Sequence, residues 1–227
     1  MNEAIINPLR QSFVDRLAAE DRDGCVQFAL QCLKEGQCTL PELYEGIIGP
    51  ALSQSEVCDI GDDGCIWHEH VKTSIVRTVI ECCWPAVAEL QRKTEIQPGS
   101  VLVLCPEKEY HEIGARMVSD FFAACGWNTV FVGANTPREQ FRAAVLMVKP
   151  AIVAVSVTDF YNLVETGKAI QKLRTVLTDH HLDGTRIFVG GHAFALNPDM
   201  ARQIGADGIL RTFSDIRALS AAKGVGA

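Results

Sequence analysis

The chain has 227 residues, of which 48% are apolar and 22% are charged, and its formal charge at pH 7 is −7. This length is sufficient for one large domain or two small ones with buried cores. Direct binding to DNA or RNA is not expected, because a chain of this charge lacks the basic surface that nucleic acids require. The charge leaves room for a protein partner that itself binds DNA.

The composition also bears on the compartment. The amino terminus, MNEAIINPLRQSF, has no basic segment followed by an apolar core, so no signal peptide is expected. No segment reaches the roughly 18 apolar residues that a membrane-spanning helix needs. The nine cysteines include no C-x-x-C pair, which argues against a disulfide framework or a thioredoxin-type site. We therefore expect a cytoplasmic protein.

The first part of the chain, residues 1–93, has helical patterns only. A capping box at residues 39–42 (T-L-P-E) predicts a helix through the following LYEGIIGPALSQ, disturbed near Pro50. Residues 65–93 predict a long helix that Pro85 kinks. About four helices in this length predict a small antiparallel bundle.

After a short polar linker at residues 94–99, the pattern changes for residues 100–227. Short β-branched runs alternate with helical stretches five times, which predicts an α/β fold. We expect a doubly wound, five-stranded parallel sheet of Rossmann-like or flavodoxin-like type, with helices on both faces. The strands are expected at residues 101–105, 129–133, 151–157, 186–191 and 207–211.

Three loops at the expected carboxyl ends of strands carry unusual residues. In doubly wound sheets this edge is where ligands bind. No G-x-G-x-x-G sequence follows the first strand and no Walker sequence is present, so a dinucleotide or a nucleoside triphosphate fits poorly. The residues are Glu109, His111 and Gly114 after the first strand, Ser156 and Thr158 after the third, and Gly190 and Gly191 after the fourth.

The residue types suggest a ligand for this edge. Glu109 lies two residues before His111, and a carboxylate there can hold one ring nitrogen while the other binds a metal. Gly114 is expected to let the backbone turn closely into the next helix. Gly190 and Gly191 are expected to leave a slot without side chains for a flat or bulky group.

The order E-Y-H-E-I-G, then S-V-T, then G-G resembles the D-x-H-x-x-G, S-x-L and G-G signature of cobalamin-binding domains of the methionine-synthase type. The helical part resembles the cap domain of the same families, so the resemblance covers about residues 10 to 215. It implies cobalamin as the cofactor, in its adenosyl, methyl or hydroxo form. The chain departs from the signature at Glu109, where aspartate is usual, at Thr158, where leucine is usual, and at Lys108, where glycine is frequent.

The resemblance also implies roles for individual residues. His111 would replace the dimethylbenzimidazole of the cofactor below cobalt, which leaves cobalamin base-off, and Glu109 would hold His111. Ser156 would hydrogen-bond the displaced nucleotide tail, which would run beside Gly190 and Gly191. A haem that uses His111 as its axial ligand is an open alternative.

The sequence CIWHEH in the helical part is the candidate for the upper face of the cofactor. Trp67 and His70 are three residues apart and share a helix face. With Glu69, they resemble the cap helix of cobalamin-dependent photoreceptors and related regulators, where the aromatic ring packs on the upper ligand. Two alternatives stay open: Trp67 in the bundle core with His68 solvated, and a zinc site of Cys65, His68 and His70.

Two functions fit these features. The first is a cobalamin-dependent sensor or regulator, including a light-responsive one, that acts through a protein partner. The segment around His111, with the following MVSDFFAACGW, also resembles the cobalamin-binding antirepressors of photosynthetic bacteria. The second is a corrinoid methyl carrier of a methyltransferase system. Neither is an enzyme by itself, no membrane partner is expected, and a homo-oligomer is open. A third class is a flavodoxin-like enzyme or another metal protein without corrin, but the sequence shows no nucleophile–base pair that would support it.

Overall fold

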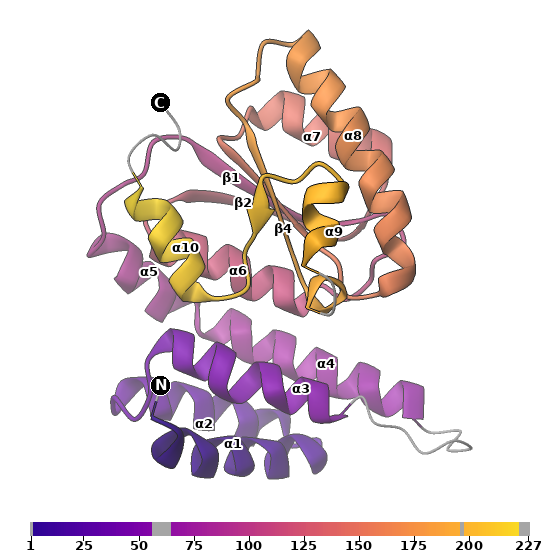
Figure 1. Ribbon diagram of the computed structural model, residues 1–227. Helices are drawn as coiled ribbons and strands as arrows, with labels where there is room; N and C mark the ends of the chain where they lie inside the picture. Colours follow the sequence, from indigo (N-terminus) through magenta and orange to yellow (C-terminus); the bar gives the residue numbers. More distant parts are fainter. Residues whose placement is uncertain (1, 56–64, 196–197, 223–227) are drawn as a thin grey trace. The chain divides into compact units, whose positions relative to one another are not determined.

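The computed structural model describes residues 2–55, 65–195 and 198–222 (Figure 1). The chain divides into two compact units, Met1–Ala88 and Glu89–Ala227, with the boundary inside a helix. The first unit is helical and the second is α/β, and each is described by itself. Within the described ranges, every helix is too short or too polar to cross a membrane.

The helical unit buries one apolar stripe of each helix in a common core. Helix α1 packs against α2, η1, α3 and α4, and the buried side chains include Phe13, Ile47 and Val76. This helical amino-terminal part agrees with the sequence prediction. Its elements are α1 (Glu3–Ala18), α2 (Arg22–Lys34), the π-helical segment η1 (Glu42–Ile48), α3 (Gly49–Ser55), α4 (Cys65–Cys82) and the start of α5 (Trp84–Arg92).

The disturbance expected near Pro50 is a π-helical stretch. Within η1 the backbone N–H of Gly49 donates to the carbonyl of Tyr44, five residues earlier. Because proline has no N–H, the carbonyl of Gly46 lacks the α-helical donor at position 50. The Nε of Arg10 in α1 donates to that carbonyl at 2.6 Å. A side chain from another helix thus satisfies the group that the proline leaves unpaired.

Pro85 separates two helices instead of kinking one. The sequence predicted a single helix over residues 65–93, whereas α4 ends at Cys82 and α5 begins at Trp84. Proline is well tolerated in the first turn of a helix, where its missing N–H has no partner to lose. The prediction of a single helix was therefore wrong. Pro85, which was expected to kink that helix, lies in the first turn of a second one.

The second unit is a five-stranded parallel sheet in the order β2-β1-β3-β4-β5, which confirms the predicted fold class. Every strand lies within a few residues of its predicted position. The elements are β1 (Ser100–Pro106), α6 (Ile113–Ala124), β2 (Asn128–Thr136), α7 (Arg138–Val148), β3 (Ile152–Ser156), η2 (Phe160–Asn162), α8 (Leu163–Asp179), β4 (Arg186–Gly190), η3 (His192–Phe194), α9 (Asp199–Gln203), β5 (Gly208–Ile209) and α10 (Phe213–Ala221).

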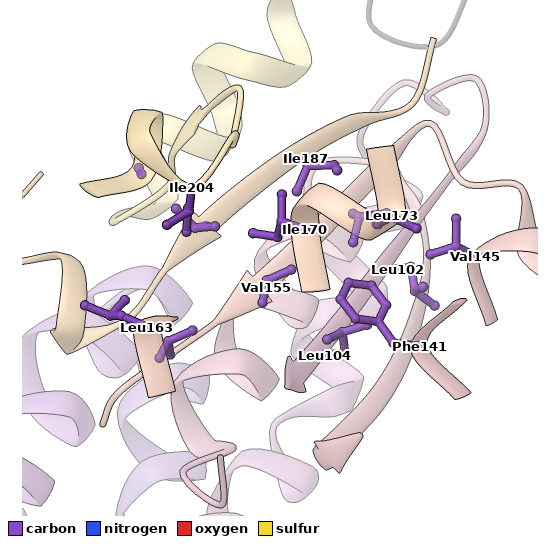
Figure 2. Close-up of a cluster of buried hydrophobic side chains, with 14 of the residues drawn as sticks. Leu102, Leu104, Phe141, Val145, Val155, Leu163, Ile170, Leu173, Ile187 and Ile204 are labelled. Atoms are coloured by element: carbon purple, nitrogen blue, oxygen red, sulfur yellow. The ribbon is translucent and has the colours of Figure 1, made fainter. Parts of the chain in front are cut away.

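Helices cover both faces of this sheet. On one face, alternate strand residues such as Leu102, Val155 and Ile187 pack against Phe141 of α7 and Ile170 of α8 (Figure 2). This follows from the two-residue period of a strand, which sends successive side chains to opposite faces. The central strands are buried on both faces, so they read as continuous apolar runs instead of alternating ones.

The opposite face carries α6 and α10, whose rings Phe121 and Phe213 meet edge to face with centroids 5.3 Å apart. In the order 2-1-3-4-5 the chain leaves β1 on one side to form β2 and then crosses to β3 on the other. The carboxyl ends of β1 and β3 therefore flank the switch point of the sheet, where such folds bind ligands. The loops that follow these two strands hold the candidate site.

Candidate functional site

The centre of the site is the carboxylate of Glu109, which follows β1 and is fully buried. Its Oε1 accepts from the backbone N–H of His111 at 3.0 Å and is 2.6 Å from the ring Nδ1 of the same residue. Its Oε2 accepts from the backbone N–H groups of Thr158 and Asp159, both at 2.9 Å, and from Nδ2 of Asn162 at 3.3 Å. Donors in and next to the loop after β3 thus hold the carboxylate of Glu109, which lies in the loop after β1.

These contacts keep Glu109 ionised and fix the tautomer of the neutral His111 ring. Burial raises the pKa of Glu109, but hydrogen bonds from His111, Asp159 and Thr158 outweigh it and bring that pKa to about 2. The ionised carboxylate can only accept hydrogen bonds, so in the neutral imidazole of His111 Nδ1 carries the proton and Nε2 carries the lone pair. The His111 side chain is 51% exposed. The result is an imidazole of fixed tautomer with Nε2 on the side away from Glu109.

Cys105, near the end of β1, also contacts the loop that contains His111. Its Sγ lies 3.6 Å from the backbone carbonyl oxygen of His111 and donates to it. Burial raises the pKa of this thiol to about 12, and the negative charges of Glu109 and Glu112 add to the effect. Cys105 is therefore a protonated structural donor and not a nucleophile.

The loop also contacts the end of β2. The backbone N–H of Asn135 donates to the carbonyl of Glu109, and the N–H of Lys108 donates to Oδ1 of Asn135, both at 2.8 Å. Lys108 has a φ of +70°, in the left-handed region that favours glycine. This conformation gives a physical reason for the glycine that is frequent at that position in the resembling domains.

Gly114 does not have the role that its sequence position suggested. It lies exposed in the first turn of α6 and is not among the glycines with positive φ, so the turn into the helix does not require it. A Cβ built at Gly114 would meet no atom of the chain within 4 Å. The backbone-turn explanation was therefore wrong, and the position is an open surface three residues beyond His111.

Gly190 and Gly191 are required by the chain itself. A Cβ at Gly190 would lie 2.6 Å from the carbonyl oxygen of Leu210, and one at Gly191 would lie 2.3 Å from that of Val157. The space expected as a slot for a ligand is thus occupied, in the direction of each Cβ, by neighbouring backbone. Ser156, nearly buried at the end of β3, pairs in register with Gly190.

In the helical unit, Trp67 is 53% exposed, which excludes the alternative that places it in the bundle core. Its ring stacks on that of His68, with centroids 3.8 Å apart. His68 is not merely solvated, because its Nδ1 lies 2.5 Å from Oε1 of Glu20. In the same helix, Glu69 is half-buried and His70 is exposed.

The zinc alternative finds no support. The described part of the chain contains no group of three histidine, cysteine, aspartate or glutamate side chains arranged to hold a metal ion. The side chain of Cys65, one of the three ligands considered, lies outside the described residues. His68 is engaged with Glu20.

The structure thus brings Glu109, His111 and the backbone of Thr158 together. Sequence reasoning missed three residues that complete this arrangement: Asn135, Asp159 and Asn162. The aspartate is a helix-start signal, because its side chain accepts from the backbone N–H of Tyr161 and caps η2. A capping pattern directly after a candidate ligand strand could have drawn attention to D-F-Y-N.

Comparison with known proteins identifies the second unit. The family described as "B12 binding domain" matches residues 99–219, more than half of the chain. The HTH-type transcriptional repressor CarA of Myxococcus xanthus is 25% identical over 88 residues, which is 39% of this chain and 29% of that protein. The chain therefore spans less than a third of that relative's length.

One solved structure supports the fold. The monomethylamine corrinoid protein of Methanosarcina barkeri matches with a TM-score of 0.73 and 16% identity, covering 97% of this chain and 98% of that one. The methanol:cobalamin methyltransferase complex MtaBC of Methanosarcina barkeri matches with a TM-score of 0.47 and 18% identity, covering 98% of this chain and 82% of that chain.

The residues at the sheet edge fit a cobalamin. A protonated Nδ1 held by a buried carboxylate leaves Nε2 as a nitrogen donor suited to cobalt, and the open position at Gly114 leaves room beside it. The cofactor is cobalamin, and the chain belongs to the B12 binding domain family.

Proposed function

We propose that the chain holds cobalamin base-off, with Nε2 of His111 as the lower ligand of cobalt, and acts as a cobalamin-dependent regulator through a protein partner. The observation that carries the proposal is the Glu109–His111 pair, a 2.6 Å contact to a fully buried carboxylate. Four further contacts hold that carboxylate in place. An imidazole steadied in this way is a typical metal ligand with its supporting carboxylate.

The chain supplies ligation and orientation. When bound, an alkylcobalamin supplies a cobalt–carbon bond that light or a methyl acceptor can break. The reactivity belongs to the cofactor, and the protein adjusts it. Glu109 holds the proton on Nδ1 of His111, so Nε2 of the neutral imidazole carries the lone pair that would bind cobalt. Because Glu109 is ionised, it also makes the imidazole a stronger donor than a neutral partner would.

The remaining loop residues are assigned to the cofactor's nucleotide tail and the corrin edge. We place the displaced tail beside Ser156 and the backbone of Gly190 and Gly191, at the same edge of the sheet as His111. Gly114 would lie under the corrin ring, where a side chain would take up space. Thr158 would act through its backbone contact with Glu109.

The regulatory role is favoured by the helical unit. An exposed tryptophan whose ring is backed by His68 offers its other face to a ligand, and we assign Trp67, Glu69 and His70 to the upper face of cobalamin. The sequence match to a transcriptional repressor points the same way. The partner would be a cytoplasmic protein that itself binds DNA, since the charge of −7 disfavours direct contact.

Absorption spectra of the purified chain with adenosyl-, methyl- and hydroxocobalamin, in the dark and after illumination, test this proposal. The wild type should show a spectrum with a nitrogen lower ligand, and His111→Ala should show one without it. His180→Ala, at the exposed end of α8, is the matched control and should resemble the wild type. A wild-type spectrum unchanged by His111→Ala would contradict the ligand assignment.

A corrinoid methyl carrier is the second candidate, favoured by the fold match over 97% of the chain to a monomethylamine corrinoid protein. Here His111 would have the same task, and the partner would be a methyltransferase. Light-driven loss of the upper ligand with a change in oligomeric state or partner binding would support the regulator. Methyl transfer to or from the bound cofactor only with a methyltransferase present would support the carrier.

A further inference from the structure

The end of β2 has an irregular geometry where it borders the His111 loop. β2 pairs with β1 in a register that shifts twice beyond Val103. Within this stretch Gly133 and Asn135 are left-handed, with φ of +98° and +49°. Irregularities of this kind bend a strand and redirect its side chains. Residues 133–136 thereby run alongside the loop that follows β1.

Asn135 contacts this loop at two backbone positions. Its N–H donates to the carbonyl oxygen of Glu109 at 2.8 Å, and its Oδ1 accepts from the N–H of Lys108 at 2.8 Å. The N–H of Glu109 donates to the carbonyl of Pro106 at 3.0 Å, so both backbone polar groups of Glu109 are paired. The backbone of Glu109 is therefore fixed from the β2 side, while its carboxylate is fixed from the β3 side.

Few residues could replace Asn135. A φ of +49° is most readily adopted by glycine, asparagine and aspartate. Glycine has no side-chain oxygen to accept from Lys108. Aspartate supplies both the conformation and the acceptor, but it adds a negative charge. Asparagine alone combines the left-handed backbone, the acceptor and neutrality.

We infer that Asn135 is a positioning residue for the lower ligand: by holding Lys108 and Glu109, it sets where the buried carboxylate directs the imidazole of His111. The carboxylate must reach His111 on one side and the Thr158–Asp159 backbone on the other, so a small shift of its own backbone would break one set of contacts. The part of this inference that concerns cobalt rests on the proposed function.

The apoprotein gives a direct test that does not need the cofactor. In protein labelled with 15N-histidine, the Nδ1–H proton of His111 should resonate at low field because Glu109 accepts it, and His111→Ala assigns the signal. Asn135→Gly should shift or broaden this signal, and Asn135→Asp should restore it. Lys149→Gly, at a left-handed residue ending α7, is the control and should leave it unchanged. An unchanged signal in folded Asn135→Gly would overturn the inference.

Cobalamin binding gives the second measurement. Asn135→Gly should weaken the affinity by about threefold to tenfold, the effect of one lost hydrogen bond, and Asn135→Asp should recover most of it. If the proton signal responds as expected while wild-type protein binds cobalamin with its own base still on cobalt, the positioning role stands and the proposed lower ligand fails. If Asn135→Gly weakens binding and Asn135→Asp does not recover it, the positioning role of Asn135 is contradicted.

Discussion

The described residues include two carboxylate–histidine pairs of nearly equal length, one in each unit. Glu109 lies 2.6 Å from Nδ1 of His111, and Glu20 lies 2.5 Å from Nδ1 of His68. The histidines are similarly exposed, at 51% and 44%, but the Glu109 side chain is 0% exposed and the Glu20 side chain is 29% exposed. The contact between the two partners therefore does not distinguish a ligand site from a surface pair.

The difference lies in what else each carboxylate contacts. Glu109 accepts from three backbone N–H groups and from Asn162 in addition to the imidazole, and this holds its pKa at about 2. Glu20 joins the turn after α1 to the first turn of α4 at the surface. Of these two pairs, the one whose carboxylate is fixed by further contacts is Glu109–His111, and we therefore place the ligand site there.

The largest expected effect comes from replacing each carboxylate by its amide. Glu109→Gln should lower the free energy of unfolding of the second unit by about 3–5 kcal/mol, because an NH2 group would face donors that now contact a buried charge. Glu20→Gln should cost less than about 1 kcal/mol, as an exposed pair does. Urea unfolding measures both losses: circular dichroism follows both variants, and Trp127, buried in the second unit, reports on Glu109→Gln once Trp67 and Trp84 are phenylalanine. Equal losses in the two variants would remove the distinction between the pairs.

Acid should weaken the contribution of Glu109 to the stability of the second unit. The pKa of Glu109 is lowered from the ordinary 4.5 to about 2, so its contribution to stability is complete above pH 4.5. As the pH falls from about 4.5 to about 2, the folded second unit should lose a contribution on the order of 3 kcal/mol. Unfolding of the apoprotein at a series of acidic pH values checks this, and Glu109→Gln should lack that component. A wild type and variant with parallel pH profiles would show that Glu109 is not the responsible group.

The features that could be predicted from the sequence are those that depend on residues close together along the chain. The five strands follow from short β-branched runs, and the Glu109–His111 pair follows from a separation of two residues. Asp159 and Asn162 lie about fifty residues from Glu109, and only the order of the strands brings them to it. Strand order is a property of long-range pairing, so a local capping pattern can mark Asp159 and Asn162 as a helix start but cannot show that they contact Glu109.

Two further features of the site also depend on residues far apart in the sequence. The contact between His68 and Glu20 spans 48 residues, so His68 could not be recognised as paired from its own surroundings. Gly190 and Gly191 were read as space for a ligand, but the carbonyls of Leu210 and Val157 occupy the positions that side chains would take. A glycine in the sequence does not tell whether a ligand or the backbone of a distant loop requires it.

A smaller effect is expected at Asn162. Asn162→Ala removes a 3.3 Å contact to Glu109 and a 3.2 Å contact to the carbonyl of Lys108, and should cost about 1–2 kcal/mol of unfolding free energy. The carboxylate keeps its other donors, so the loss should be well below that of Glu109→Gln. Asn128→Ala, at the exposed start of β2, is the control for the same substitution. Chemical denaturation compares the three, and a loss as large as that of Glu109→Gln would assign Asn162 the dominant role.

The smallest effect on stability is expected at the other pair. His68→Ala should cost less than about 1 kcal/mol, but it removes the ring that stacks on Trp67. The emission of Trp67, obtained as the difference from Trp67→Phe, should therefore change in intensity and wavelength. If Trp67 faces the upper ligand, the same variant should narrow the difference in affinity between adenosyl- and methylcobalamin. Unchanged emission would show that the stacking does not persist in solution.

The central claim is that a histidine nitrogen, and not the cofactor's own base, lies below cobalt. Electron paramagnetic resonance of the bound cofactor in its Co(II) state, in protein labelled with 15N-histidine, tests it directly, because 14N splits each cobalt line into three and 15N splits it into two. The account predicts doublets in the wild type and their loss in His111→Ala. Triplets in the labelled wild type would mean that dimethylbenzimidazole remains on cobalt and would contradict the role given to His111.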